Sequence, residues 1–265
     1  MGAFKEVFAR TEIKYLLEKE QYESVREYLE RIARVDEYGL TRINNIYFDT
    51  PDYRLIRTSL EKPVYKEKLR LRTYGQTTDD TGSFIEIKKK YKGTVYKRRI
   101  SGRYADHYDY LTGKGDEIER SQIAGEIEQT LQYYRELRPA MSVCYDRIAL
   151  AGTEDPGLRI TFDTNITYDE GCRDLRTVTP GKPLLKEGQH LMEIKVSGGF
   201  PMEFARRLSE LSVFPTSYSK YGSGYQDMMR ERMLVARSRE VVRDKSTAAA
   251  EQRRRYLQKG VTAYV

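Results

Sequence analysis

Four basic side chains alternate along residues 65–72 (YKEKLRLR), at Lys66, Lys68, Arg70 and Arg72. In a β-strand, residues two apart project from one face, so this spacing places four cations together and leucines on the opposite face. A row of like charges needs an anion opposite it: acidic side chains, a nucleic acid backbone or a small polyanion. It could equally be the solvated outer face of an antiparallel sheet, where polar and apolar residues normally alternate.

The tripeptide Glu-Ile-Lys occurs at 12–14, 86–88 and 193–195, each time within a predicted strand. Each copy places a carboxylate and an ammonium on one face. If the sheet closes, these faces converge on one interior. A basic interior with a few carboxylates suits a metal-chelated polyphosphate, because Arg and Lys neutralise phosphate oxygens and a carboxylate holds the divalent ion. Ordinary cross-strand salt bridges at the surface are the alternative.

Alternation and helical spacing predict an α+β chain. Strands are predicted at 7–15, 41–48, 64–74, 84–91, 94–101, 141–152, 158–168 and 191–196. Helices are predicted at 18–34, over most of 103–140, at 201–212 and from 227 to about 257.

Composition limits the class of protein. Lys plus Arg total 47 and Asp plus Glu total 40, so the net charge of +7 is compatible with an anionic partner. Cys144 and Cys172 lack metal-ligand spacing and suggest a reducing compartment. We find no signal peptide and no membrane segment, and we expect a cytoplasmic protein. The basic run at 230–255 lacks interleaved aromatics, so we expect no nucleic acid partner.

The segments RTEIKYLL, IYFDT, KLRLRTYG, FIEIKKKY, YDRIAL, LRITFDTNI, LMEIKV and SYSKYGSGY follow in this order over about residues 8–225. Together they resemble the VTC domain, the polyphosphate polymerase domain of the CYTH-like, triphosphate tunnel metalloenzyme superfamily. The resemblance implies a closed antiparallel β-barrel tunnel of about eight strands, with helices packed outside. It gives a tunnel domain at 1–225 and a C-terminal basic helical tail at 226–265.

The same resemblance implies an enzyme that transfers the γ-phosphate of ATP to a growing inorganic polyphosphate chain. Its partners would be ATP and polyphosphate or pyrophosphate, and its cofactor Mn²⁺ or Mg²⁺. The expected catalytic residues are Lys14, Arg70, Arg72, Lys88, Arg147, Lys195 and Lys220. The expected substrate-binding residues are Glu12, Lys68, Glu86, Arg99, Tyr145, Arg159 and Ser219, and the expected metal ligand is Glu193.

Three departures qualify this resemblance. Hydrolytic relatives carry Glu-x-Glu-x-Lys on the first strand, whereas Arg10 stands at the first position here and favours the polymerase. Ser217 occupies a position where the family often has a lysine. The membrane and sensing modules of eukaryotic relatives are not expected in this chain. An inorganic triphosphatase of the same fold and a non-catalytic polyphosphate- or phosphoprotein-binding module remain the alternatives.

Overall fold

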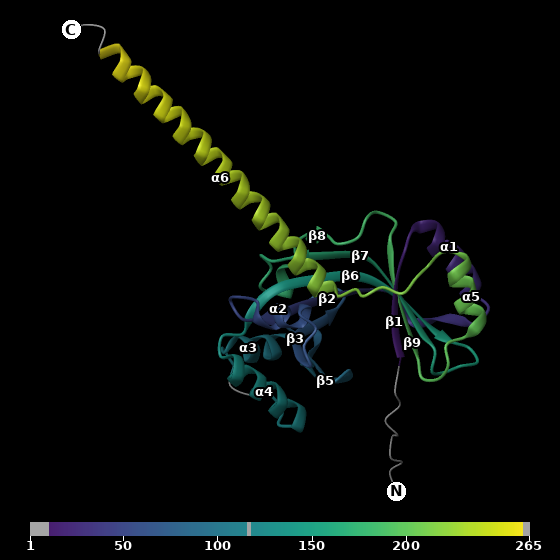
Figure 1. Ribbon diagram of the computed structural model, residues 1–265. Helices are drawn as coiled ribbons and strands as arrows, with labels where there is room; N and C mark the ends of the chain where they lie inside the picture. Colours follow the sequence, from purple (N-terminus) through teal and green to yellow (C-terminus); the bar gives the residue numbers. More distant parts are fainter. Residues whose placement is uncertain (1–10, 116–117, 262–265) are drawn as a thin grey trace. The chain divides into compact units, whose positions relative to one another are not determined.

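The computed structural model describes residues 11–115 and 118–261, which form a mixed α+β protein (Figure 1). The chain divides into two compact units, Met1–Gly224 and Tyr225–Val265. The assignment of these parts to a tunnel domain and a separate tail stays a prediction.

The strands are β1 (Thr11–Leu17), β2 (Ala33–Asp49), β3 (Tyr65–Tyr74), β4 (Gly82–Tyr91), β5 (Thr94–Arg103), β6 (Arg138–Gly152), β7 (Arg159–Asp169), β8 (Lys182–Pro183) and β9 (His190–Val196). The helices are α1 (Lys19–Leu29), α2 (Arg54–Leu60), α3 (Tyr104–Thr112), α4 (Gln122–Tyr134), the short 3₁₀ turn η1 (Leu175–Thr177), α5 (Met202–Glu210) and α6 (Lys220–Val261).

One antiparallel sheet contains all of these strands. Their order is β1-β9-β7-β6-β2-β3-β4-β5, and the short β8 pairs with β7. Strands β1 and β5 stand at the two ends of this order, and the described residues show no hydrogen-bonded ladder that joins them. The predicted large antiparallel sheet in an α+β fold is confirmed, whereas a closed barrel is not. Strand β5 is exposed along almost its whole length, as expected of an edge strand.

The sheet is nevertheless strongly curled. The Lys14 ammonium on β1 donates a hydrogen bond to the carbonyl oxygen of Tyr218 over 3.0 Å, and the Lys68 ammonium on β3 donates one to Ser219 Oγ over 2.9 Å. Strands β1 and β3 have four other strands between them. In a flat sheet they would lie about 24 Å apart. Their contact with two consecutive residues therefore requires the sheet to bend around the segment that precedes α6.

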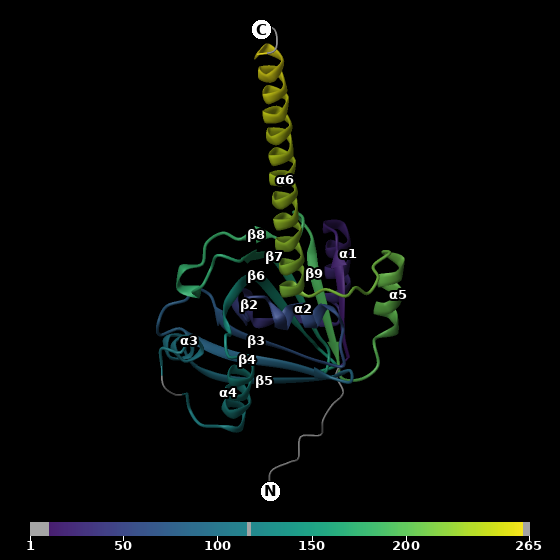
Figure 2. The ribbon, with the colours of Figure 1, turned by 60° about the vertical axis from the view of Figure 1, so that its left-hand side comes forward.

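Two apolar cores cover the outer side of this curled sheet. In the first, α1 and α5 place Leu29 and Phe204 against apolar residues of β1, β7 and β9. In the second, α3 and α4 place Tyr104 and Ile127 against apolar residues of β2, β3 and β4. Figures 1 and 2 show α1 with α5 at one end of the sheet and α3 with α4 at the other. Burial of these residues ties the helices to the outer face and leaves the alternate strand residues for the inner face.

The boundary between α1 and β2 differs from the sequence prediction. Periodicity predicted a helix over 18–34, but α1 ends at Leu29 and β2 begins at Ala33. Ile32 continues the helical spacing, yet it packs against the first core from the turn that follows α1. Strand β2 is also longer than the predicted strand at 41–48, because Ala33 and its neighbours pair with the end of β6.

The segment 103–140, predicted as mostly helical, contains the separate helices α3 and α4. Helix α3 ends at Thr112 and is followed by Gly113, whose φ of 71° lies in the left-handed region that glycine adopts without strain. A new helix then begins after Ser121, whose side chain accepts a hydrogen bond from the Ala124 amide. Strand β6 already begins at Arg138.

A buried carboxylate joins the end of β2 to two helices. The Asp49 carboxylate accepts hydrogen bonds from the Leu55 and Ile56 amides of α2, over 2.8 Å and 3.0 Å. It also accepts a 2.8 Å bond from the Tyr221 hydroxyl in the first turn of α6. The Tyr221 ring stacks on the Tyr47 ring with centroids 4.3 Å apart. This network fixes the start of α6 against β2.

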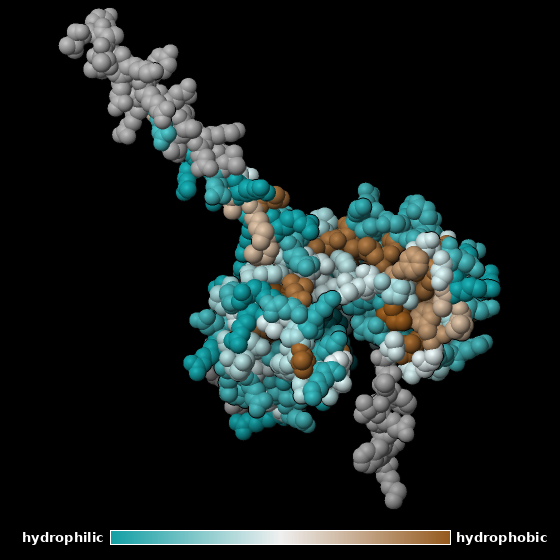
Figure 3. Space-filling model, in the orientation of Figure 1, coloured by the Kyte–Doolittle hydropathy of each residue, from teal (hydrophilic) through white to brown (hydrophobic). Residues whose placement is uncertain are grey.

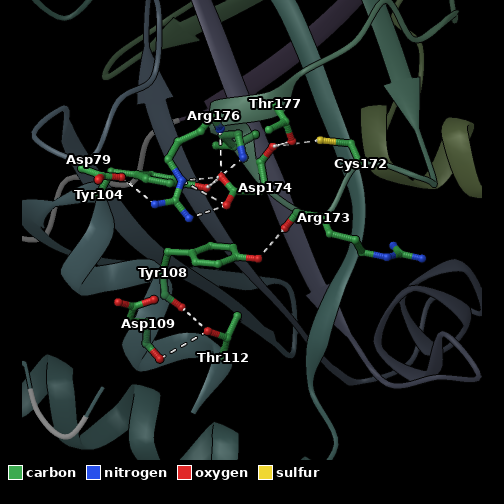
Figure 4. A network of polar contacts seen from close by, with 11 residues as sticks. Asp79, Tyr104, Tyr108, Asp109, Thr112, Cys172, Arg173, Asp174, Arg176 and Thr177 are labelled. Atoms are coloured by element: carbon green, nitrogen blue, oxygen red, sulfur yellow. Dashed lines mark hydrogen bonds and ion pairs between the residues drawn. The ribbon is translucent and has the colours of Figure 1, made fainter. Parts of the chain in front are cut away.

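A second network fastens the loop after β7 to α3 (Figure 4). The Arg176 guanidinium pairs with Asp174 and Asp79, each over 2.5 Å, and lies over the rings of Tyr104 and Tyr108. The Tyr104 hydroxyl donates to Asp174 over 2.9 Å. Because this loop follows β7, the contacts hold that strand's end in place on the outer side of the sheet.

The surface is mostly polar. On the face drawn in Figure 3, apolar atoms break the hydrophilic surface near α1 and α5. Within the described ranges, no helix is both long and apolar enough to cross a membrane.

We expect Asp49→Ala to lower the free energy of unfolding by about 3 kcal/mol, because buried amide and hydroxyl donors would lose their acceptor. Tyr221→Phe removes one bond to a charged group and should cost about 1.5 kcal/mol. Urea unfolding measures both. Asp80→Ala, at an exposed carboxylate, is the control and should change stability by less than about 0.5 kcal/mol. Equal effects of Asp49→Ala and Asp80→Ala would contradict a structural role for this network.

Candidate functional site

Charged side chains from seven strands gather on the inner side of the curled sheet. Directly paired residues of antiparallel strands share a face, and the pairs include Lys14 with Glu193 and Arg147 with Asp163. The pair of Arg70 with Glu86 continues the same surface on β3 and β4. We call this surface the charged face. It consists of Glu12, Lys14, Lys68, Arg70, Arg72, Glu86, Lys88, Lys97, Arg147, Asp163, Glu193 and Lys195, with Ser219 and Lys220 from the start of α6.

Glu86 is the carboxylate that balances the β3–β5 part of the charged face. Its side chain is only 2% exposed and accepts a hydrogen bond from Arg70 Nε over 2.7 Å. Arg72 Nη2 and Lys97 Nζ lie 3.6 Å and 3.3 Å from its oxygens. Burial alone would raise the pKa of Glu86, but Arg70, Arg72 and Lys97 outweigh it and hold the pKa at about 2.

Asp163 is the carboxylate that balances the cations where β6 and β7 meet. Its fully buried carboxylate accepts two hydrogen bonds from Arg147, over 2.6 Å and 2.8 Å, and pairs with Lys220 Nζ over 2.5 Å. Burial opposes ionisation of Asp163, yet Lys220 and Arg147 lower its pKa. A lysine from α6 is thereby held against strands β6 and β7.

A third cluster joins β1 and β9. Lys195 Nζ lies 2.6 Å from Glu193 Oε1, and Lys14 Nζ lies 3.7 Å from Glu193 Oε2. Lys14 also lies 3.5 Å from Glu12 Oε1, so two carboxylates share one ammonium. Burial acts to raise the pKa of Glu193, but Lys195 and Lys14 lower it well below its usual range.

Lys68 and Lys88 differ from these cations. They lie directly opposite one another on β3 and β4. Among the described residues, no carboxylate lies within ion-pair distance of either ammonium. The two lysines therefore form a positive pair that has no ion-pair partner among the described residues, next to Ser219.

Polar residues of β2 and β6 orient the arginines. The Asn45 side-chain oxygen accepts a hydrogen bond from Arg72 Nε over 2.9 Å, and the Tyr47 hydroxyl accepts one from Arg70 Nη1 over 3.0 Å. Tyr145 lies under two cations, with Lys220 Nζ 4.5 Å from its ring centroid. Burial would raise the pKa of Tyr145, but Arg72 and other nearby cations lower it to about 8.

The carboxylates of the charged face do not form a metal site by themselves. Among the described residues, no group of three His, Cys, Asp or Glu side chains could hold an ion. Mg²⁺ and Mn²⁺ in phosphate sites commonly take one or two carboxylates and complete their shell with phosphate oxygens and water. Glu193, with Glu12 close by on β1, fits that kind of donor set. The site suits a metal that arrives with phosphate rather than one held by the protein alone.

The structure brings most of the predicted site residues together on the charged face. Arg159 lies opposite Lys195 at the end of β7, but its side chain pairs with Asp36 over 3.2 Å and is 58% exposed. Arg99 projects from the edge strand β5 over the Phe84 ring, 4.8 Å from its centroid. Arg10 lies outside the described residues.

Sequence analysis missed four residues that the structure places at the site: Asn45, Tyr47, Lys97 and Asp163. A signal existed for two of them. Lys97 stands two residues before the predicted Arg99, and Asp163 stands four residues after Arg159, so both belong to alternating rows on one strand face. Asn45 and Tyr47 carried no such signal, because their role depends on pairing between β2 and β3.

Comparison with known proteins supports a family assignment. A family model described as the VTC domain matches residues 9–229. Similar solved structures include a provisionally assigned adenylate cyclase from Bacillus halodurans, with 14% identity, a TM-score of 0.48 and coverage of 78% of this chain and 92% of that one. Another such protein, from Vibrio parahaemolyticus, shows 12% identity, a TM-score of 0.43 and coverage of 81% and 96%.

A third similar structure is a provisionally assigned adenylyl cyclase from Hippeastrum, described as having a dominant triphosphatase activity. It shows 14% identity, a TM-score of 0.43 and coverage of 83% of this chain and 96% of that one. The family assignment rests on the family model and not on these structures.

We expect Glu86→Gln to destabilise the protein at neutral pH by about 3 kcal/mol, because a pKa of about 2 in place of 4.5 reflects that much stabilisation of the carboxylate. The pKa is lowered on folding, so this stability is complete above pH 4.5 and is lost as the pH falls towards 2. The difference in the free energy of unfolding between wild type and Glu86→Gln should therefore be smaller at about pH 3.5 than at neutral pH. Urea unfolding at the two pH values measures it.

Glu126→Gln is the matched control for this experiment. Glu126 contacts Lys89 and Arg98 at 3.6 Å and 3.7 Å, away from the charged face, and this substitution should cost less than about 1 kcal/mol. A Glu86→Gln effect that is no larger than the control, or that does not change with pH, would refute the compensating role of Glu86.

Proposed function

The chain belongs to the VTC domain family, and on this premise we propose that it is an ATP-dependent polyphosphate polymerase. The proposed reaction moves the γ-phosphate of ATP to the end of an inorganic polyphosphate chain and releases ADP. The observation that carries the proposal is the excess of cations over carboxylates on the charged face. The cations there are Lys14, Lys68, Arg70, Arg72, Lys88, Lys97, Arg147, Lys195 and Lys220, and the carboxylates are Glu12, Glu86, Asp163 and Glu193.

This excess suits a chain of phosphates better than a single anion. The cations come from β1, β3, β4, β5, β6 and β9 and from the start of α6, so they surround the inner side of the sheet. A polyphosphate carries a negative charge on every phosphate, and one ligand could therefore contact several strands at once. Arginines can bind phosphate oxygens with two parallel hydrogen bonds, which also fixes their direction.

The carboxylates prepare the cations for this task. Glu86 holds Arg70 and Asp163 holds Arg147, in each case through hydrogen bonds shorter than 3 Å. Donors that are fixed before the substrate arrives need no reorganisation when charge develops in the transition state. The repulsion between these positive groups is therefore overcome when the protein folds and not when the substrate binds.

The proposed transfer needs no covalent intermediate with the protein. A terminal oxygen of the polyphosphate attacks the γ-phosphorus of ATP, and the bond between that phosphorus and the β,γ-bridging oxygen breaks. ADP leaves with that oxygen, and the chain is one phosphate longer. Phosphoryl transfer of this kind depends on in-line positioning and on neutralisation of charge. Arg70, Arg72 and Arg147 would neutralise the phosphate oxygens, and Lys220 would bind beside them.

Glu193 is the residue proposed to hold a divalent metal, with Glu12 close to it. Glu193, with Glu12 beside it, would hold this ion, and the ion would supply positive charge that neutralises part of the phosphate charge. Lys14 and Lys195 contact Glu193 and keep it ionised, because they lower its pKa. The carboxylate is therefore available as a metal ligand throughout the physiological pH range.

The test of this function is to incubate the purified chain with ATP, Mn²⁺ and a trace of pyrophosphate and to separate the products by length on a gel. We expect a ladder of long chains and a matching amount of ADP. Orthophosphate released from added tripolyphosphate, without chains, would instead indicate a triphosphatase. Binding of polyphosphate with neither product would indicate a binding module. Either of these two results would overturn the proposed polymerase.

We expect Glu193→Gln to lower the rate of chain synthesis by about 10²-fold or more, because it removes the proposed metal ligand while keeping the side-chain size. Binding of polyphosphate should change by less than about tenfold, since the cations remain. Calorimetry without metal measures the binding, and the gel assay measures the rate. Glu187→Gln, in the loop before β9, is the matched control and should keep wild-type activity. Full activity of Glu193→Gln would remove Glu193 as the metal ligand.

A further inference from the structure

Lys68 is the cation of the charged face whose surroundings are most unfavourable to a charge. Its one hydrogen-bond partner in the described part of the chain is a neutral hydroxyl, Ser219 Oγ, at 2.9 Å. Ser219 Oγ also accepts the Gly222 amide over 3.1 Å, as the cap of α6. A neutral amine keeps two N–H groups and can make the same bond to Ser219, so this contact does not require a charged lysine.

Positive groups face Lys68 from three strands. Lys66 and Arg70 flank it on β3, Lys88 lies opposite on β4, and Lys14 approaches from β1. At the end of the neighbouring strand β2, the Asp49 carboxylate gives no compensation, because it already accepts hydrogen bonds from amides of α2 and from Tyr221. Helix α2 offers only a backbone carbonyl, which accepts a bond from Lys66.

The other lysines of the charged face are compensated. Lys14 and Lys195 contact Glu193, Lys97 contacts Glu86, and Lys220 contacts Asp163. Lys88 lacks an ion pair among the described residues and burial lowers its pKa, but Glu12 and Glu193 oppose that shift, whereas only cations act on Lys68. Lys68 is thus the group for which an incoming phosphate would supply the missing negative charge.

We propose that Lys68 is a proton-uptake site: it is largely a neutral amine in the free protein at about pH 8, and it takes a proton from the solvent when a phosphate chain binds beside Lys88 and Ser219. This inference rests on the proposed polyphosphate-binding function and deepens it. No covalent bond changes, since the solvent supplies the proton and the bound phosphate balances the new ammonium.

The direction of the pKa change agrees with this geometry. Burial, with Lys88 and Lys66 adding to it, lowers the pKa of Lys68 to about 7. About nine-tenths of Lys68 would then be neutral at pH 8. A phosphate within a few ångströms stabilises the ammonium and returns the pKa towards its ordinary value. Binding should therefore weaken as the pH rises above 7, by up to about tenfold per pH unit.

The test is calorimetry of tripolyphosphate binding to the full chain, without metal, at about pH 8 in buffers with different ionisation enthalpies. The slope of the observed enthalpy against the buffer enthalpy gives the number of protons taken up. We expect wild type to take up about 0.9 proton more than Lys68→Arg, because arginine is already charged. Comparing the two proteins cancels the protons that tripolyphosphate itself exchanges.

Two further variants make the result decisive. Lys68→Met should lose the extra proton uptake and also bind tripolyphosphate more weakly at about pH 6. Lys90→Arg makes the same chemical change two residues beyond Lys88 on β4 and should take up protons like wild type. Equal uptake by wild type and Lys68→Arg, with tripolyphosphate bound by both, would overturn the inference and leave the proposed function standing. Absence of binding to wild type would overturn both.

Discussion

The structure depends on one electrostatic constraint, which is the crowding of positive charges on the inner side of a curled sheet. Two like charges 4 Å apart repel by about 4 kcal/mol at the effective dielectric constant typical of protein surfaces. Glu86, Asp163 and Glu193 offset this repulsion, and each contacts at least two cations. The remaining positive charge makes the inner side attractive to a polyanion.

The outer side of the sheet provides the stability that this arrangement requires. Apolar residues of the same strands pack under α1 and α5 in one core and under α3 and α4 in the other. The two faces of these strands therefore differ, since one packs in the apolar cores and the other carries the charged side chains. The networks around Asp49 and Arg176 then fix α2, the start of α6 and the loop after β7.

The segment that precedes α6 connects the charged face without a closed ring of hydrogen-bonded strands. Tyr218 and Ser219 accept bonds from Lys14 on β1 and Lys68 on β3, and Lys220 pairs with Asp163 on β7. Side-chain contacts thus bring distant strands of one sheet around a common centre. The same contacts leave Lys68 with a neutral hydrogen-bond partner, Ser219.

The sequence by itself determined the strand alternation, and with it the residues that share a face, because side chains in a strand repeat every two residues. It also carried the motifs by which the family was identified, and it located Lys14, Arg70, Arg147 and Glu193. The sequence did not predict that the first helix ends at Leu29, because Ile32 in the following turn continues the apolar spacing of the helix.

Only the tertiary structure decided which charges meet. Asp163 and Lys220 are far apart in the sequence and form an ion pair because α6 begins beside β7. Asn45 reaches Arg72 because β2 and β3 are in that register. It also decided that the sheet curls while β1 and β5 stay unpaired in the described chain. The physical reason is that local periodicity fixes the face of a strand, whereas strand order, register and curvature arise from contacts between residues that are distant in the sequence.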